Sequence, residues 1–311
     1  MAKNYDFLKL LSKKNKFLKI IYNKLDLSFV LQKTSLFFGT ASSIVNELNY
    51  LNIPSCLFSV SDNQNQNLKY RENFGQFLHL NRKEALNNKR IVDLLLVLVK
   101  NIKRVKKLSN QKNLTVDKYG SQRIFEEIKK YKINIKNEKK IKKQTNKKKD
   151  GLYPVSDNLI NEYLEARNLK QNRNNSINTN LINKVDHYIW WFTTKRKSFY
   201  LQREEKIRLF LSQELVTFKR NLFWAGGWFN SKSKCTVLDI MKALKWQIAY
   251  SKKISKSPWI VLIKKSNQIV FKINQYLGYK LITQKSDKIK CQAIKNFYKI
   301  KNLNNYHFLK K

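Results

Sequence analysis

Residues 36–60 read LFFGTASSIVNELNYLNIPSCLFSV, and this stretch decides the fold class that the sequence predicts. Apolar residues occupy positions 36–38 and positions 56–58 and 60, as in buried strands, and recur at helical spacing over 44–51. The pattern predicts strand, helix, strand, which is a βαβ unit, and the polar run 61–67 then predicts a loop. The residues that set the boundaries are Gly39, the possible helix caps Thr40 and Ser42, and the helix-ending Asn52 and Pro54.

Composition points to a globular protein with a polyanionic partner. The 311 residues are 42% hydrophobic, enough for a core, and carry 64 Lys+Arg against 21 Asp+Glu, a formal net charge of +43. Such a charge repels itself unless a polyanion neutralises it, and nucleic acid is the obvious candidate. A membrane surface is the competing partner. The longest apolar run, 91–99, is about half of the roughly 20 residues that a membrane span requires, so no membrane insertion is expected.

Cysteine usage and codon bias suggest a compartment. Cys56, Cys235 and Cys291 are far apart and show no C-x-x-C spacing, so neither a zinc site nor a disulfide framework is predicted. Lysine, asparagine and isoleucine are the dominant residue types in the composition. AT-rich codons bias a coding sequence toward these residues, and organellar genomes commonly have such codons. Residues 1–20 are basic enough for a transit peptide, but Asp6 and the helical run that follows fit folded structure equally well. We expect a protein of the mitochondrial matrix, encoded by the organelle.

The first half of the chain contains two further helical patterns. Residues 4–25 combine an apolar face with lysines, and 91–105 carry the strongest helical stripe in the sequence. After Lys106 the chain turns polar and lysine-rich with little apolar periodicity, so residues 106–184 are predicted to be a basic extension, partly disordered on its own.

Aromatic residues return from Tyr188 to Trp228 and could stack on bases, but apolar residues at helical spacing over 207–222 favour a packed helix. A second βαβ pattern follows. The segment 237–248 reads as a strand end or helix, 259–263 as a strand, 269–277 as a helix ended by Gly278, 279–282 as a strand and 289–303 as a basic helix.

Short motifs resemble the bacterial-type small-subunit ribosomal protein two family. Glu47, Leu48, Leu51, Ile53 and Pro54 resemble its E-A-x-x-L-x-I-P signature before a core strand, residues 87–91 its N-D-D-A-I helix start, and residues 11–14 its L-T-K-K. In the second half, residues 237–242 resemble its I-I-D-L-x-K motif and 260–263 its I-L-F-V strand.

The two groups of motifs stand in reversed order, so the resemblance implies a circularly permuted member of that family. It implies an α/β fold: a three-layer Rossmann-like parallel sheet with flanking helices, plus a protruding helical hairpin and a basic extension. The implied divisions are the second hairpin arm (1–28), the first half of the α/β domain (29–105), the basic linker (106–184), the second half of the domain (185–284) and the first hairpin arm (285–311).

Catalytic fingerprints are missing from the sequence. Gly39 stands alone after its strand, and no G-x-G-x-x-G, P-loop, H-E-x-x-H or nucleophile elbow occurs. His79, His187 and His307 are scattered, as surface or packing histidines are. The sequence therefore predicts no catalytic residue, no metal site, no cofactor, no small-molecule substrate and no enzyme.

The expected function is a structural constituent of the mitochondrial small ribosomal subunit, which binds small-subunit ribosomal RNA through its phosphates and contacts neighbouring ribosomal proteins. An organellar RNA-binding assembly factor or an intron maturase is the alternative. The residues expected to contact RNA are Lys89, Arg90, Lys103, Arg104, Lys139, Lys140, Lys232, Lys234, Lys264 and Lys265.

Overall fold

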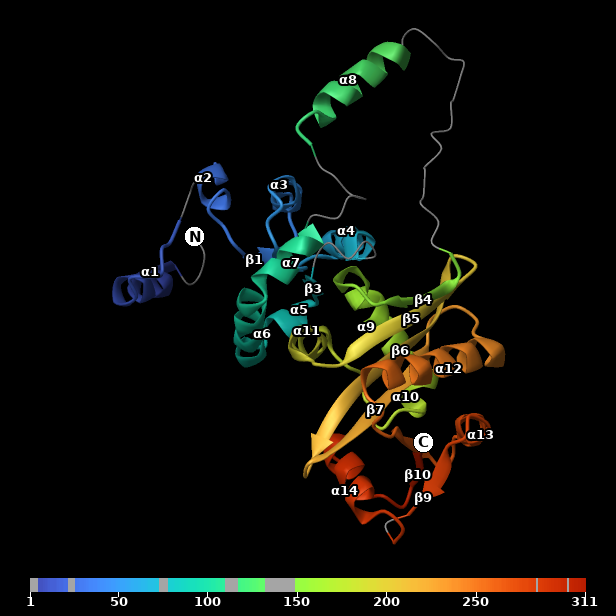
Figure 1. Cartoon of the computed structure of the whole chain (residues 1–311). Helices are drawn as coiled ribbons and strands as arrows, with labels where there is room; N and C mark the ends of the chain where they lie inside the picture. Colours follow the sequence, from blue (N-terminus) through green and yellow to red (C-terminus); the bar gives the residue numbers. More distant parts are fainter. Residues whose placement is uncertain are drawn as a thin grey trace.

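The computed structural model describes residues 5–21, 26–72, 78–109, 117–131, 149–283, 285–300 and 302–311. Within these ranges the chain is a mixed α/β protein whose strands form three sheets: β1-β2-β3, β4-β5-β6-β7 and β8-β10-β9 (Figure 1). No helix in these ranges is both long and apolar enough to cross a bilayer.

The N-terminal unit contains the βαβ unit that residues 36–60 predict. β1 and β2 pair in parallel with Phe38 opposite Cys56, and β3 adds a third parallel strand to β2. The prediction of a polar loop over 61–67 is wrong, because residues 62–67 belong to α4, a helix with Asp62 in its first turn. The elements of this unit are α1 (Tyr5–Lys14), α2 (Ser28–Leu31), β1 (Phe37–Thr40), α3 (Ile44–Tyr50), β2 (Ser55–Phe58), α4 (Asp62–Glu72) and β3 (Leu78–Leu80).

The apolar stripe of 91–105 is confirmed as helical, with a break at Asn101. Leu94 and Leu98 are fully buried and pack in one hydrophobic cluster with Tyr188 and Phe192 from the second half of the chain. The burial of these apolar side chains stabilises the contact between the N-terminal unit and the second half of the chain. The helices here are α5 (Arg82–Ala85), α6 (Asn88–Lys100) and α7 (Ile102–Ser109).

The segment 106–184 was expected to be a basic extension, and much of it is regular structure. Helix α8 (Gly120–Tyr131) stands apart from the other elements in Figure 1. Strand β4 (Gly151–Pro154) pairs with β5, and helices α9 (Ile160–Asn168) and α10 (Lys170–Asn174) follow a 3₁₀ turn, η1 (Asp157–Leu159). Because Ile160, Tyr163 and Leu164 are buried, α9 is part of the core despite its polar neighbours.

The helix expected over 207–222 is wrong. The residues form a long antiparallel hairpin, in which Leu209 and Leu211 face one hydrophobic cluster and Phe210 faces another. Lys219 and Arg220 adopt positive φ angles of 44° and 65°, as a two-residue hairpin turn requires. The helix before this sheet is α11 (Lys184–Thr193), and the strands are β5 (Lys197–Arg203), β6 (Lys206–Phe218) and β7 (Asn221–Asn230).

Helix α12 (Val237–Ile254) covers one face of this sheet, and α9 and α11 pack on the other. The predicted strand 259–263, helix 269–277 and left-handed Gly278 are confirmed, the last with φ 85°. The remaining elements are β8 (Ile260–Lys264), α13 (Gln268–Tyr276), β9 (Lys280–Ile282), α14 (Lys288–Phe297) and β10 (Tyr306–Lys310).

A single parallel sheet built from both halves is not what the chain forms. Within the described ranges, parallel pairing is confined to β1-β2-β3 and to one bridge between β7 and the start of β8, whereas β4 to β7 are antiparallel. Helix α14 is shorter than the helix expected over 289–303, because Lys299 ends it with a positive φ of 52° and the N–H of Ile300 returns to the carbonyl of Lys295. The chain then returns as β10 between β8 and β9.

Candidate functional site

The parting of β7 from β8 forms the centre of the candidate site. The two strands meet at a parallel bridge between Trp224 and Trp259, where the N–H of Trp224 donates to the carbonyl of Pro258 at 2.8 Å. Beyond that bridge they belong to different sheets. In the described part of the chain, the outer edge of β7 therefore pairs with no further strand beyond this bridge.

Side chains from two helices reach this edge. The hydroxyl of Tyr298 donates to the carbonyl of Gly226 at 3.1 Å. The amide of Asn172, in α10, donates to the carbonyl of Asn230 at 2.7 Å and accepts from its N–H at 3.2 Å. These hydrogen bonds come from single side chains. A ligand can replace them more easily than it could replace the continuous row of backbone hydrogen bonds that a neighbouring strand would make.

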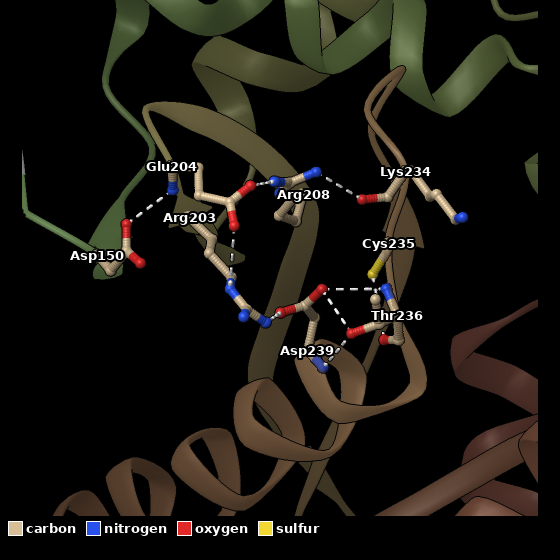
Figure 2. A network of polar contacts seen from close by, with 8 residues as sticks. All are labelled: Asp150, Arg203, Glu204, Arg208, Lys234, Cys235, Thr236 and Asp239. Atoms are coloured by element: carbon tan, nitrogen blue, oxygen red, sulfur yellow. Dashed lines mark hydrogen bonds and ion pairs between the residues drawn. The ribbon is translucent and has the colours of Figure 1, made fainter.

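The loop 231–236 leads from the end of β7 into α12 and is basic (Figure 2). Thr236 and Asp239 form a capping box, in which the N–H of Asp239 donates to Thr236 Oγ1 at 3.2 Å and the N–H of Thr236 donates to Asp239 Oδ2 at 3.0 Å. Arg203 Nη1 lies 3.1 Å from Asp239 Oδ1. Burial would raise the pKa of Asp239, but the hydrogen bonds from Thr236 and the Arg203 guanidinium outweigh it and lower that pKa.

Arg208 holds the loop from the other side. Its Nη1 donates to the carbonyl of Lys234 at 2.9 Å, and its Nη2 pairs with Glu204. Asp150 accepts from the N–H of Glu204 at 2.8 Å, which ties the start of β4 to the same network. Figure 2 shows the Lys234 side chain pointing away from these contacts, so its charge stays available to a ligand.

A second polar cluster lies under α9, on the opposite face of the sheet. Burial raises the pKa of Tyr163, and the Ser198 hydroxyl, which lies 3.4 Å from Tyr163 Oη, opposes that rise. Arg196 Nε lies 3.8 Å from Glu214 Oε2, and Arg167 Nη1 is buried without a hydrogen-bond partner. A buried guanidinium N–H without an acceptor indicates room for an anion or water.

Burial holds two of the cysteines and one histidine in their neutral forms. Burial raises the pKa of Cys56 to about 12 and that of Cys235 to about 11, so these thiols stay protonated at neutral pH. Burial lowers the pKa of His187 to about 4, and its Nε2 lies 2.9 Å from the carbonyl of Ile160. The described residues contain no cluster of three His, Cys, Asp or Glu side chains that could hold a metal.

Eight of the ten residues expected to contact RNA are described by the structure, and these eight do not form one surface. Arg90 pairs with Asp93 and Asp186, and Arg104 pairs with Asp157 at 2.7 Å, so both hold the N-terminal helices against the second half of the chain. Lys89 and Lys103 lie on the same helices, α6 and α7. Lys139 and Lys140 lie outside the described residues.

Two of the ten residues lie in the candidate site, and two others line a separate cavity. Lys232 and Lys234 share the loop before α12, where Lys232 pairs with Glu165. Lys264 and Lys265 end β8 and line one cavity. The sequence does not predict Asn172, Arg167 or Tyr298 as site residues, because no motif includes them. The contacts that Asn172 and Tyr298 make with β7 join residues that are 58 or more positions apart in the sequence.

Comparison with known proteins gives neither a family model nor a curated protein that matches. Solved structures do match. A ribosomal-protein-alanine N-acetyltransferase from Brucella melitensis is 11% identical with a TM-score of 0.39, covering 51% of this chain and 98% of its own. The yncA protein from Salmonella typhimurium, with its cofactor acetyl-CoA, is 11% identical with a TM-score of 0.41, covering 53% and 94%. An acetyltransferase of the GNAT family from Streptococcus pneumoniae is 10% identical with a TM-score of 0.37, covering 51% and 96%.

These findings correct the ribosomal interpretation. The named structures are acetyltransferases or hold acetyl-CoA, and none is itself a ribosomal protein. The expectations of a ribosomal protein, of a protein that is no enzyme and of no small-molecule substrate are withdrawn. We therefore also withdraw the expected roles as a constituent of the ribosomal subunit, in binding ribosomal RNA, as an assembly factor and as a maturase. The physical reason lies in the motif at 237–242, which starts a long helix on an antiparallel sheet rather than a unit of a parallel one. At such identities and TM-scores the similarities assign no activity to this chain.

Proposed function

We propose that residues 149–311 form an acyltransferase domain that takes an acyl thioester of coenzyme A between β7 and β8. The proposal rests on the geometry of this chain, and the parting of the two strands after the Trp224–Trp259 bridge is the observation that carries it. An open strand edge can pair with an extended chain that contains amide groups, as the pantetheine arm of coenzyme A does.

The phosphates of such a ligand fit the basic loop. Lys232 and Lys234 are exposed, and the loop runs directly into the N-terminus of an 18-residue helix. The N–H groups of Val237 and Leu238 start that helix at exposed positions, where intrahelical acceptors are missing. Asp239 accepts the N–H of Thr236 at the start of this helix, and the negative charge of Asp239 is offset by its ion pair with Arg203.

The reacting end of the ligand fits the region around Gly226. Bound coenzyme A thioester would supply an activated acyl group. Burial raises the pKa of Tyr298, so its hydroxyl keeps its proton at neutral pH and can donate it beside the carbonyl of Gly226. Asn172 has to release the backbone of Asn230 for an extended chain to pair with the end of β7.

Isothermal titration of the whole protein with acetyl-CoA tests this proposal. We expect saturable binding that Lys232→Ala combined with Lys234→Ala weakens by at least tenfold, since two phosphate contacts are lost. Lys242→Ala combined with Lys245→Ala removes equal charge from exposed positions of α12 and should leave the affinity unchanged within twofold. A wild-type protein that does not bind acetyl-CoA, or two double variants that behave alike, would contradict it.

Three sequence-based predictions are carried forward as proposals. The codon bias supports a mitochondrial location, which fractionation tests. The divisions at residues 28 and 105 can be tested by limited proteolysis, whereas those at 184 and 284 would fall inside the proposed domain 149–311. The Rossmann-like description is proposed for residues 36–105 alone, supported by the parallel order β1-β2-β3.

A further inference from the structure

We propose that the cavity at the end of β8 is a second anion site, which takes the phosphate group of a small-molecule phosphomonoester. The cavity has a volume of about 470 Å³ and is lined by Thr179, Lys264, Lys265, Ser266 and Asn305, among others. This volume lies in the range of sites for small ligands, roughly 300–1,000 Å³. The inference goes beyond the proposed acyltransferase function and does not depend on it.

Positive charge gathers around this cavity without carboxylates to balance it. Arg167, Arg173, Lys264 and Lys265 make no ion pair with any Asp or Glu that the structure describes. Burial lowers the pKa of Lys264, and the charge of Arg167 lowers it further. Burial also lowers the pKa of Arg167. Cations that repel one another in a partly buried place gain most from a bound anion.

The arginines and Lys264 shape the cavity wall. Arg167 Nη2 donates to the carbonyl of Asn178 at 3.2 Å, and Arg173 Nη1 donates to that of Thr179 at 3.0 Å. Lys264 Nζ donates to the carbonyl of Asn174 at 2.7 Å. These bonds fix the loop 174–182, so the cavity is preformed.

The remaining groups favour phosphate over a carboxylate. Thr179 and Ser266 bring hydroxyl donors and Asn305 an amide donor, beside the ammonium groups of Lys264 and Lys265. Helix α13 begins two residues after Ser266, with Asn267 as its cap, and adds positive potential from its N-terminus. A phosphate has three strong acceptor oxygens and about two negative charges, which match this number of donors better than a carboxylate does.

Titration of the full chain with inorganic phosphate, followed by ³¹P NMR at constant ionic strength, tests the inference. Acetate serves as the carboxylate probe in a competition. We expect saturable phosphate binding that Lys265→Gln weakens at least fivefold. Lys265→Gln leaves the Lys264 contact with Asn174 in place, so the wall should survive. The matched control Lys245→Gln removes one exposed charge from α12 and should change the affinity by less than twofold.

Each other outcome overturns the proposal. Equal competition by acetate would contradict a phosphate site, and equal effects of the two lysine variants would reduce the binding to attraction by the net charge. The variant with Lys232→Ala and Lys234→Ala should keep its phosphate affinity. Loss of acetyl-CoA binding with phosphate binding intact, or the reverse, therefore separates this site from the acyltransferase proposal.

Discussion

The indole rings of Trp224 and Trp259 stack with their centroids 6.0 Å apart and their planes inclined by 23°. Trp259 Nε1 donates to Ser251 Oγ at 2.7 Å, and Trp224 Nε1 donates to the carbonyl of Ser255 at 3.2 Å. The end of α12 is thus fixed to both strands at the point where they join. The proposed ligand site along the outer edge of β7 depends on this junction.

Trp259→Ala should lower the free energy of unfolding by about 3–5 kcal/mol, because it removes a buried ring and leaves a cavity. Urea denaturation followed by circular dichroism measures the change. Ser251→Ala keeps the ring but removes the acceptor of Trp259 Nε1 and the bond from Ser251 Oγ to the carbonyl of Ile248, and should cost about 1–3 kcal/mol. A loss below about 1 kcal/mol for Trp259→Ala would show that the two rings do not anchor the junction.

Gly226→Ala and Gly227→Ala form a matched pair on β7. A Cβ at Gly226 would lie 2.1 Å from the carbonyl oxygen of Ser212, whereas a Cβ at Gly227 meets nothing within 4 Å. We expect Gly226→Ala to destabilise the protein by about 1–3 kcal/mol and Gly227→Ala to have a much smaller effect. Thermal unfolding of the two variants compares them directly. Equal losses would be inconsistent with the close approach of β6 and β7.

His187 makes stability depend on pH. Its pKa of about 4 in the folded protein lies below the unfolded value of about 6.5, so the unfolded chain binds more protons between the two. Stability should therefore fall by up to about 3 kcal/mol as pH drops from 6.5 to 4. In His187→Gln this part of the pH dependence should vanish. Parallel curves for the wild type and the variant in urea melts across this range would refute the assignment.

Asp239 makes stability depend on pH in the same sense as His187, but at lower pH. Its pKa is lowered in the folded state, so its contribution is present above the unfolded pKa of about 3.9 and is lost as pH falls through the folded value. Asp239→Asn should cost about 1–2 kcal/mol at pH 7, because the capping box and the Arg203 pair weaken. The difference from the wild type should shrink in acid. A constant difference down to pH 2 would exclude an ionised Asp239 as its source.

The sequence predicts local structure well where one pattern is possible. Apolar runs around Gly39 and Pro54 leave little choice but two strands and a helix, and the structure has all three. Residues 207–222 fit two patterns, because Phe210 and Leu211 satisfy helical spacing while Leu209 and Leu211 also satisfy alternation. Lys219 and Arg220 make the hairpin turn without the glycine or asparagine that usually marks one.

Most of the candidate site could not be predicted from the sequence, because its residues are brought together only by the tertiary fold. Lys232, Lys234, Lys264 and Lys265 could be singled out by charge, but charge alone did not say that they lie in two separate places. Asn172 and Tyr298 act through contacts with β7 that only the tertiary fold creates. The ribosomal resemblance failed because motifs of a few residues report a local turn or helix start and not the direction in which the next strand pairs.

Hydrogen exchange of the whole protein, with and without acetyl-CoA, is the most direct test of the donor site between β7 and β8. The account predicts slower exchange at residues 226–238, which cover the open edge of β7, the basic loop and the start of α12, with little change over 36–105. Unchanged exchange at 226–238 under saturating acetyl-CoA, or protection found elsewhere alone, would contradict it.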